Sequence, residues 1–124
     1  KPSVVMRKLG ANLGKTKAEQ EAEALQGESS AVGATPISLC TGGQVSTIAG
    51  VLRSVTLRPR NTVPAVEAML YDGSGQVRLV WLGRRQIPGV TPGRAVVVTG
   101  RVTCNETDPT IFNPRYELRG AQAS

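Results

Sequence analysis

Histidine is absent from all 124 residues of this chain. Without an imidazole, the chain has no histidine general acid or base, no histidine to activate a serine or cysteine nucleophile, and no histidine ligand for zinc. Its two cysteines, Cys40 and Cys104, lie far apart and form no CxxC motif, which argues against a metal site. Walker-type glycine loops and paired-carboxylate motifs are also missing. The sequence therefore predicts a protein that is not an enzyme and holds no metal or cofactor.

Aromatic residues are scarce, at 3% of the chain: Tyr71, Trp81, Phe112 and Tyr116. Hydrophobic residues still reach 40%, so a core must consist mostly of valine, leucine, isoleucine and alanine. No apolar run approaches the roughly 18 residues of a membrane span, and no signal-peptide pattern is present. We therefore expect a cytoplasmic protein without membrane contact, and we expect a monomer.

Positive charge is what the chain has in excess, with a net charge of +6 and a pI near 10.0. From Gln44 onward there are ten arginines and five acidic residues but no lysine. Arginine suits planar, bidentate contacts to phosphate, so this bias favours a polyanionic partner. The charge could also serve solubility alone, and a coding bias could favour arginine over lysine.

The first 43 residues differ from the rest. Thr16 to Glu19 form a capping-box pattern, alanine and glutamate dominate as far as Gln26, and Gly27 indicates a stop. Residues 28–43 are small and polar, as in a linker. We predict that residues 1–43 form a largely flexible N-terminal tail with at most one short helix, at about residues 16–26.

After residue 43 the hydrophobic period changes to two, which is typical of β-strands. Gly50 interrupts the first apolar stretch, where a glycine would let the strand bend, and Asn113-Pro114 interrupts the last. The stretch from Gly83 to Gly93 has room for one helical turn at most. The pattern predicts an all-β domain over residues 44–118, a small five-stranded barrel, and a short C-terminal tail over residues 119–124. The predicted strands are Val45–Leu57, Ala65–Tyr71, Gln76–Leu82, Arg94–Thr103 and Thr110–Leu118.

The hairpin from Tyr71 to Gly83, with its Asp-Gly-Ser-Gly turn and its alternating strand ending at Trp81, resembles the second-to-third strand hairpin of OB-fold nucleic-acid-binding domains. The segments Val45–Leu52 and Gly93–Val102 are similar to the first and fourth strands of that family. The Trp-Leu-Gly-Arg-Arg, Ile-Pro-Gly and Asn-Pro-Arg-Tyr-Glu-Leu segments resemble those of small actinobacterial OB-fold proteins, and the OB wedge domain of RecG-type helicases looks like a more distant relative. The resemblance implies a five-stranded OB-fold barrel that binds nucleic acid.

OB barrels that bind nucleic acid use the outer face of strands two and three, flanked by the loops after strands one and four. The first of these loops contains an Arg-Pro-Arg sequence, which holds two charges in a stiff segment. Carried onto this sequence, the resemblance implies seven contact residues: Arg53, Arg58, Arg60, Tyr71, Arg78, Arg84 and Arg85.

The expected contacts are mainly to phosphate, because few aromatic residues can stack on bases. Trp81 alternates in phase with Val77 and Leu79, so we assign it to the interior. Tyr71 lies on the same side of its strand as Glu67 and Met69 and could stack on a base. Glu106 and Asp108 in the loop after the fourth strand would repel phosphate. The sequence therefore predicts weak, one-sided and salt-dependent binding of single-stranded DNA or RNA.

Several alternatives stay open. Each single arginine could be a solvated surface charge. The scarcity of aromatics and the acidic loop also fit a protein-interaction module that docks onto a DNA-processing or other partner. Cys40 and Cys104 flank two strands that pair in OB folds, so they could form a disulfide, or they could be two free thiols in a reducing cytoplasm.

Overall fold

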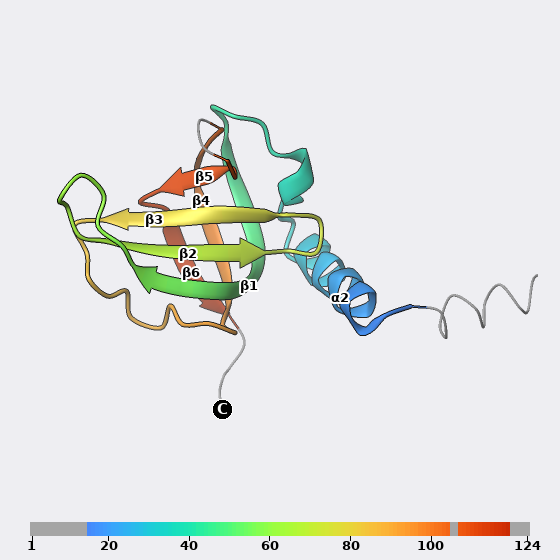
Figure 1. The fold of residues 1–124 in the computed structure, drawn as a ribbon. Helices are drawn as coiled ribbons and strands as arrows, with labels where there is room; N and C mark the ends of the chain where they lie inside the picture. Colours follow the sequence, from blue (N-terminus) through green and yellow to red (C-terminus); the bar gives the residue numbers. More distant parts are fainter. Residues whose placement is uncertain (1–14, 105–106, 120–124) are drawn as a thin grey trace, which may run out of the picture.

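The computed structural model describes residues 15–104 and 107–119. A β-sheet that closes on itself forms the body of the molecule, and one α-helix lies at its side (Figure 1). Helix α2 spans Lys17–Ala31, and the 3-10 turn η1 spans Ile37–Leu39. The strands are β1 (Val45–Leu57), β2 (Ala65–Tyr71), β3 (Gln76–Leu82), β4 (Ala95–Thr103), β5 (Thr110–Phe112) and β6 (Arg115–Arg119).

Five strand positions form a closed ring. β1 pairs antiparallel with β2 and β4, β2 pairs antiparallel with β3, and the parallel pairing of β3 with β5 closes the ring. β5 and β6 are the two halves of the predicted last strand, and both pair with β4. Between them, Asn113 takes a left-handed φ of 52° and Pro114 has no N–H to donate. The predicted five-stranded barrel is confirmed, with its interruption where the sequence indicated.

β1 is irregular at Arg53, three residues after the glycine at which a bend was predicted. The pairing with β2 shifts register between Leu52 and Ser54, so Arg53 is the extra residue of a β-bulge. At Gly50 a side chain is excluded for another reason, since a Cβ atom there would lie 2.4 Å from the carbonyl oxygen of Tyr71. Glycine thus permits the close approach of the two backbones, and the bulge places both Arg53 and Ser54 on the exposed side.

The barrel interior is filled by aliphatic side chains from β1 to β5. Trp81 joins them with 5% of its surface exposed, and its indole N–H donates to the carbonyl of Pro114 at 3.0 Å. This confirms the core assignment made from strand parity. The short segment between β3 and β4 forms no helix, and its side chains Ile87 and Val90 pack into the core. The cluster includes Ile48, Leu52, Leu70, Val77, Leu79, Ile87, Val90, Val96, Val98, Val102 and Ile111.

The capping box predicted at the start of the helix is present. The Thr16 hydroxyl accepts the N–H of Glu19 at 3.0 Å, and the Glu19 carboxylate accepts the N–H of Thr16 at 2.9 Å. The helix runs four residues past the predicted stop at Gly27. A glycine at an exposed helix position destabilises the helix by only about 1 kcal/mol relative to alanine, so it does not have to end the helix. Ser29 beyond Gly27 is buried, so tertiary packing carries the helix onward. No described helix is long and apolar enough to cross a membrane.

The segment between α2 and β1 packs against the barrel, although the composition of residues 28–43 predicted a linker. Ile37 lies in the core, and its N–H donates to Oδ2 of Asp72 at 2.8 Å. The other oxygen of Asp72 caps the β2–β3 turn by accepting the N–H groups of Ser74 and Gly75. One buried carboxylate therefore joins the segment before β1 to the hairpin. Residues 1–14 and 120–124 of the predicted tails lie outside the described residues.

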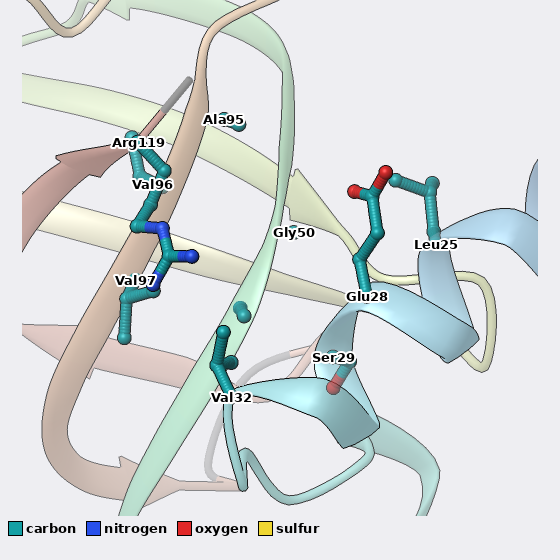
Figure 2. Close-up of a pocket in the computed structure, with 10 residues that line it drawn as sticks. Leu25, Glu28, Ser29, Val32, Gly50, Ala95, Val96, Val97 and Arg119 are labelled. Atoms are coloured by element: carbon teal, nitrogen blue, oxygen red, sulfur yellow. The ribbon is translucent and has the colours of Figure 1, made fainter. Parts of the chain in front are cut away.

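A small cavity lies between α2 and the sheet (Figure 2). Leu25, Ser29 and Val32 line it from the helix, Gly50 from β1, and Arg119 from the end of β6. The hydroxyl of Ser29 is buried and has no hydrogen-bond partner among the described residues. The helix therefore packs on the barrel less completely than the strands pack on one another.

Candidate nucleic-acid interface

The outer face of β1, β2 and β3 carries most of the predicted contact residues. Side chains alternate along a strand, so the pairing places Glu67, Met69 and Tyr71 on this face, with Arg78 opposite Met69. A shallow groove crosses the face. Its walls are mostly polar and come from all three strands and the residue directly after β1: Ser54, Thr56, Arg58, Glu67, Ala68, Met69 and Arg78.

Glu67 lies near the middle of this face and is only 8% exposed. Its Oε2 accepts Nε of Arg60 at 2.9 Å, and its Oε1 lies 3.7 Å from Nε of Arg78. Arg78 also lies 3.5 Å from Oδ2 of Asp108. A buried carboxylate between two guanidinium groups fixes their positions and offsets part of their charge. Arg60 and Arg78 are therefore held on the face by acidic partners.

The loop after β1 is a tight hairpin. Arg60 and Val63 exchange two backbone hydrogen bonds, at 2.8 and 2.9 Å, across Asn61 and Thr62. Both central residues have positive φ values, 49° and 69°, as in a type I′ turn. The N–H of Arg58 continues this ladder to Ala65 at 2.8 Å. The predicted stiffness of this loop therefore comes from hairpin pairing as well as from Pro59.

Three exposed arginines lie beside this hairpin. Arg58 follows β1 directly, and the N–H of Gly83 donates to the carbonyl of Pro64 at 2.7 Å, which places Arg84 next to the hairpin base. Arg85 lines a hollow together with Thr56 and other residues at the end of β1. Within the described part of the chain, none of the three arginines forms an ion pair. They constitute the uncompensated positive charge of this end of the barrel.

The other end of the face, where β2 ends, lies next to α2 (Figure 1). It carries Tyr71 and Arg53. The guanidinium of Arg53 stacks on the ring of Tyr71, 4.3 Å from its centroid, and also lies 3.4 Å from a carboxylate oxygen of Glu21 in the helix. One face of the Tyr71 ring is therefore covered within the molecule. The seven residues of β2 separate this pair from the hairpin end by about 20 Å. The predicted contact residues thus form two groups.

Phe112 is a further candidate that is not among the seven predicted contact residues. It is 36% exposed, it pairs with Val80 across the parallel β3–β5 ladder, and the guanidinium of Arg60 lies 5.4 Å from its ring centroid. Leu82, also exposed, extends β3 beside it. The only sequence signal was an apolar residue before the Asn-Pro break. Its place on this face depends on the pairing of β3 with β5, which local pattern does not show.

The loop after β4 was expected to repel phosphate. Glu106 lies outside the described residues, whereas Asp108 is partly buried and its side chain is directed at Arg78. The charge of Asp108 is therefore partly offset by the face itself. Among residues 15–104 and 107–119, no three histidine, cysteine or acidic side chains are grouped so as to hold a metal ion.

Comparison with solved structures shows the same fold elsewhere. The chain is similar to the solution NMR structure of the replication factor A related protein from Methanobacterium thermoautotrophicum, with a TM-score of 0.53 and 11% sequence identity. The alignment covers 69% of this chain and 90% of the other, and at this identity it shows the fold alone. No curated protein matches the chain significantly.

The family comparison covers nearly the whole barrel. Residues 46–119, which run from the start of β1 to the end of β6, match the family model described as OB-fold nucleic acid binding domain. This range includes the outer face, the arginine-bearing hairpin and Phe112. Because the match extends over more than half of the sequence, this chain belongs to the family of OB-fold nucleic-acid-binding domains.

Proposed function

We propose that the protein binds single-stranded DNA or RNA without catalysing a reaction, and that arginine–phosphate contacts supply most of the affinity. The observation that carries this proposal is the group of three exposed arginines, Arg58, Arg84 and Arg85, that lack ion-pair partners in the described part of the chain. Arg60 and Arg78 lie next to them in positions set by Glu67. Preset guanidinium groups lose little conformational entropy when they contact phosphate.

Exposed apolar side chains beside these arginines favour the binding of a single strand over that of a duplex. Phe112 and Leu82 are exposed beside Arg60, and a base can stack on such a surface only when it is not stacked within a helix. Tyr71 offers only one uncovered ring face, because Arg53 covers the other. Few stacking surfaces and two acidic residues on the face support weak, sequence-tolerant binding.

Fluorescence anisotropy of labelled oligonucleotides across a salt series tests this proposal. Single-stranded DNA and RNA should both be compared with a duplex of the same length. We expect tighter binding of a single strand than of the duplex, and an affinity that falls steeply with salt. Absence of binding at low salt, or binding that salt does not change, would refute the proposal.

A protein-interaction module is the second candidate, and exposed apolar side chains favour it. Leu57, Val63 and Leu82 all lie near the hairpin end and are more exposed than core residues of their type. Glu67 and Asp108 also reduce the net positive charge of the face. A partner retained in pull-downs after nuclease treatment would support this role. The similarity to actinobacterial OB-fold proteins and to the RecG wedge domain stays a prediction.

A further inference from the structure

The two cysteines of the chain lie in neighbouring segments beside the start of β1, at the end of the barrel away from the 58–64 hairpin. The β1–β4 ladder continues beyond its last paired residues. Val102 donates its N–H to Gln44 at 2.9 Å, and its carbonyl accepts the N–H of Gly43 at 2.6 Å. Cys104 therefore leaves β4 where the segment carrying Cys40 enters β1.

The side chain of Cys104 faces that segment. A Cβ atom built on Gly42 would lie 3.2 Å from Sγ of Cys104, so the sulfur packs against the glycine two residues after Cys40. A side chain at position 42 would crowd this sulfur. Gly43, with φ 89°, completes a small exposed turn, and the two adjacent glycines permit the movement that sulfur–sulfur bonding requires.

The two thiols differ in their surroundings. Cys104 is exposed, whereas Cys40 is partly buried and packs against the core. Burial raises the pKa of the Cys40 thiol; a hydrogen bond with Ser46 offsets part of the rise, and the proximity of Asp72 and of Cys104 adds to it. The exposed thiol is thus the one that meets an oxidant first, and the buried thiol reacts second.

We propose that Cys40 and Cys104 form a reversible disulfide under thiol-oxidising conditions. The Cys104 thiolate attacks oxidised glutathione, which forms a mixed disulfide and releases one glutathione thiolate. The Cys40 thiolate then attacks Sγ of Cys104, forms the internal bond and releases the second glutathione. Two cysteine thiols are oxidised, one glutathione disulfide is reduced, and the two cysteine protons pass to the departing thiolates.

The bond would fasten the α2–η1 segment to the barrel. At present this segment is held by the burial of Ile37 and by its hydrogen bond to Asp72. A cross-link between residues 40 and 104 closes a long loop, which lowers the entropy of the unfolded chain. We expect the Tm of the oxidised protein to rise by about 5 °C or more, and reduction to reverse the rise.

The test uses the full chain incubated without denaturant in a series of oxidised-to-reduced glutathione ratios, followed by thiol alkylation and intact mass analysis. The wild-type monomer should lose both thiols, with a mass lower by two hydrogen atoms. In Cys40→Ser the reaction should stop at a glutathione adduct on Cys104. In Cys104→Ser the remaining thiol of Cys40 should react with oxidised glutathione more slowly than Cys104 does in Cys40→Ser. Oxidant should raise the Tm of the wild-type protein but not the Tm of either variant.

Three results would overturn the proposal: retention of both thiols, a stable glutathione adduct on wild-type Cys104, or disulfide-linked dimers in place of an internal bond. Circular dichroism of each sample shows whether the fold is intact, so a misfolded variant is recognised directly. No nucleic acid enters these measurements. The proposal therefore stands or falls separately from the proposed binding function.

Discussion

The two ends of the outer face carry the same residue type in different surroundings. At the hairpin end, Arg58, Arg84 and Arg85 are exposed and form no ion pair within the described residues. At the helix end, Arg53 is stacked on Tyr71 and paired with Glu21 of α2. An arginine already satisfied inside the molecule must give up those contacts to reach a phosphate. We therefore expect nucleic acid to bind mainly at the hairpin end.

The largest expected effect is on the hairpin-end arginines. Replacing Arg58, Arg84 and Arg85 together by alanine should weaken single-strand binding by about tenfold or more at low salt. The log–log salt slope should become shallower by about 2, since each lost phosphate contact removes about 0.7. Anisotropy titrations at several salt concentrations measure both changes.

The matched control for that variant replaces Arg101, Arg115 and Arg119 by alanine. These three arginines are exposed on β4 and β6, outside the outer face of β1 to β3, and their removal lowers the net charge equally. An equal loss of affinity in both triple variants would show that overall charge, and not the hairpin end, governs binding.

Glu67 tests whether the hairpin-end charges are set in place by the barrel. Glu67→Gln keeps the size of the side chain but removes the charge between Arg60 and Arg78. Two partly buried guanidinium groups then lose a charged partner, so we expect the free energy of unfolding to fall by about 1–2 kcal/mol. Urea denaturation measures this loss. The exposed Glu117→Gln on β6 serves as the control, and an equal effect there would contradict the assigned role.

Phe112 and Tyr71 compare base stacking at the two ends. Phe112→Ala should weaken single-strand binding by about 1 kcal/mol, or roughly fivefold, without changing the salt slope. Tyr71→Ala should have the smaller effect, because Arg53 covers one face of its ring. Parallel anisotropy titrations of both variants measure the difference. A greater loss from Tyr71→Ala would move the stacking site to the helix end.

The smallest expected effect comes from Glu21. Glu21→Gln releases Arg53 from a solvent-exposed ion pair, which contributes about 0–1 kcal/mol at most. Affinity for single-stranded oligonucleotides should therefore rise less than about threefold, and only at low salt. Glu23→Gln, also exposed on α2, is the matched control because its neighbour Lys15 lies outside the face. A large rise from Glu21→Gln would mean that the helix end is also a main binding surface.

Much of the fold could be predicted from short stretches of the sequence. Strand positions, the Asp72 turn, the capping box at Thr16 and the break at Asn113 all depend on neighbouring residues, and each lies where it was predicted. The end of the helix was predicted wrongly, and the bulge of β1 was not predicted. The helix continues past Gly27, where Ser29 is buried, and the bulge lies at Arg53, where the pairing with β2 shifts register.

The candidate site was accessible only in part. Charge composition and the resemblance together indicated arginines on one face, and three of those named, Arg58, Arg78 and Arg85, line hollows on or beside the β1–β3 face. Sequence could not rank them, because exposure and pairing depend on residues far away in the chain. Arg60 meets Glu67 and Phe112, while Arg53 meets Glu21 across the helix contact.

The sequence alone determined that this chain is an arginine-rich, all-β barrel without histidine chemistry, because composition and a period of two are properties of the residues themselves. Tertiary structure decided which positive charges remain uncompensated. Barrel closure brings β5 beside β3, and the docking of α2 brings Glu21 to Arg53. Whether an arginine can reach a phosphate depends on these long-range contacts, which no local pattern encodes.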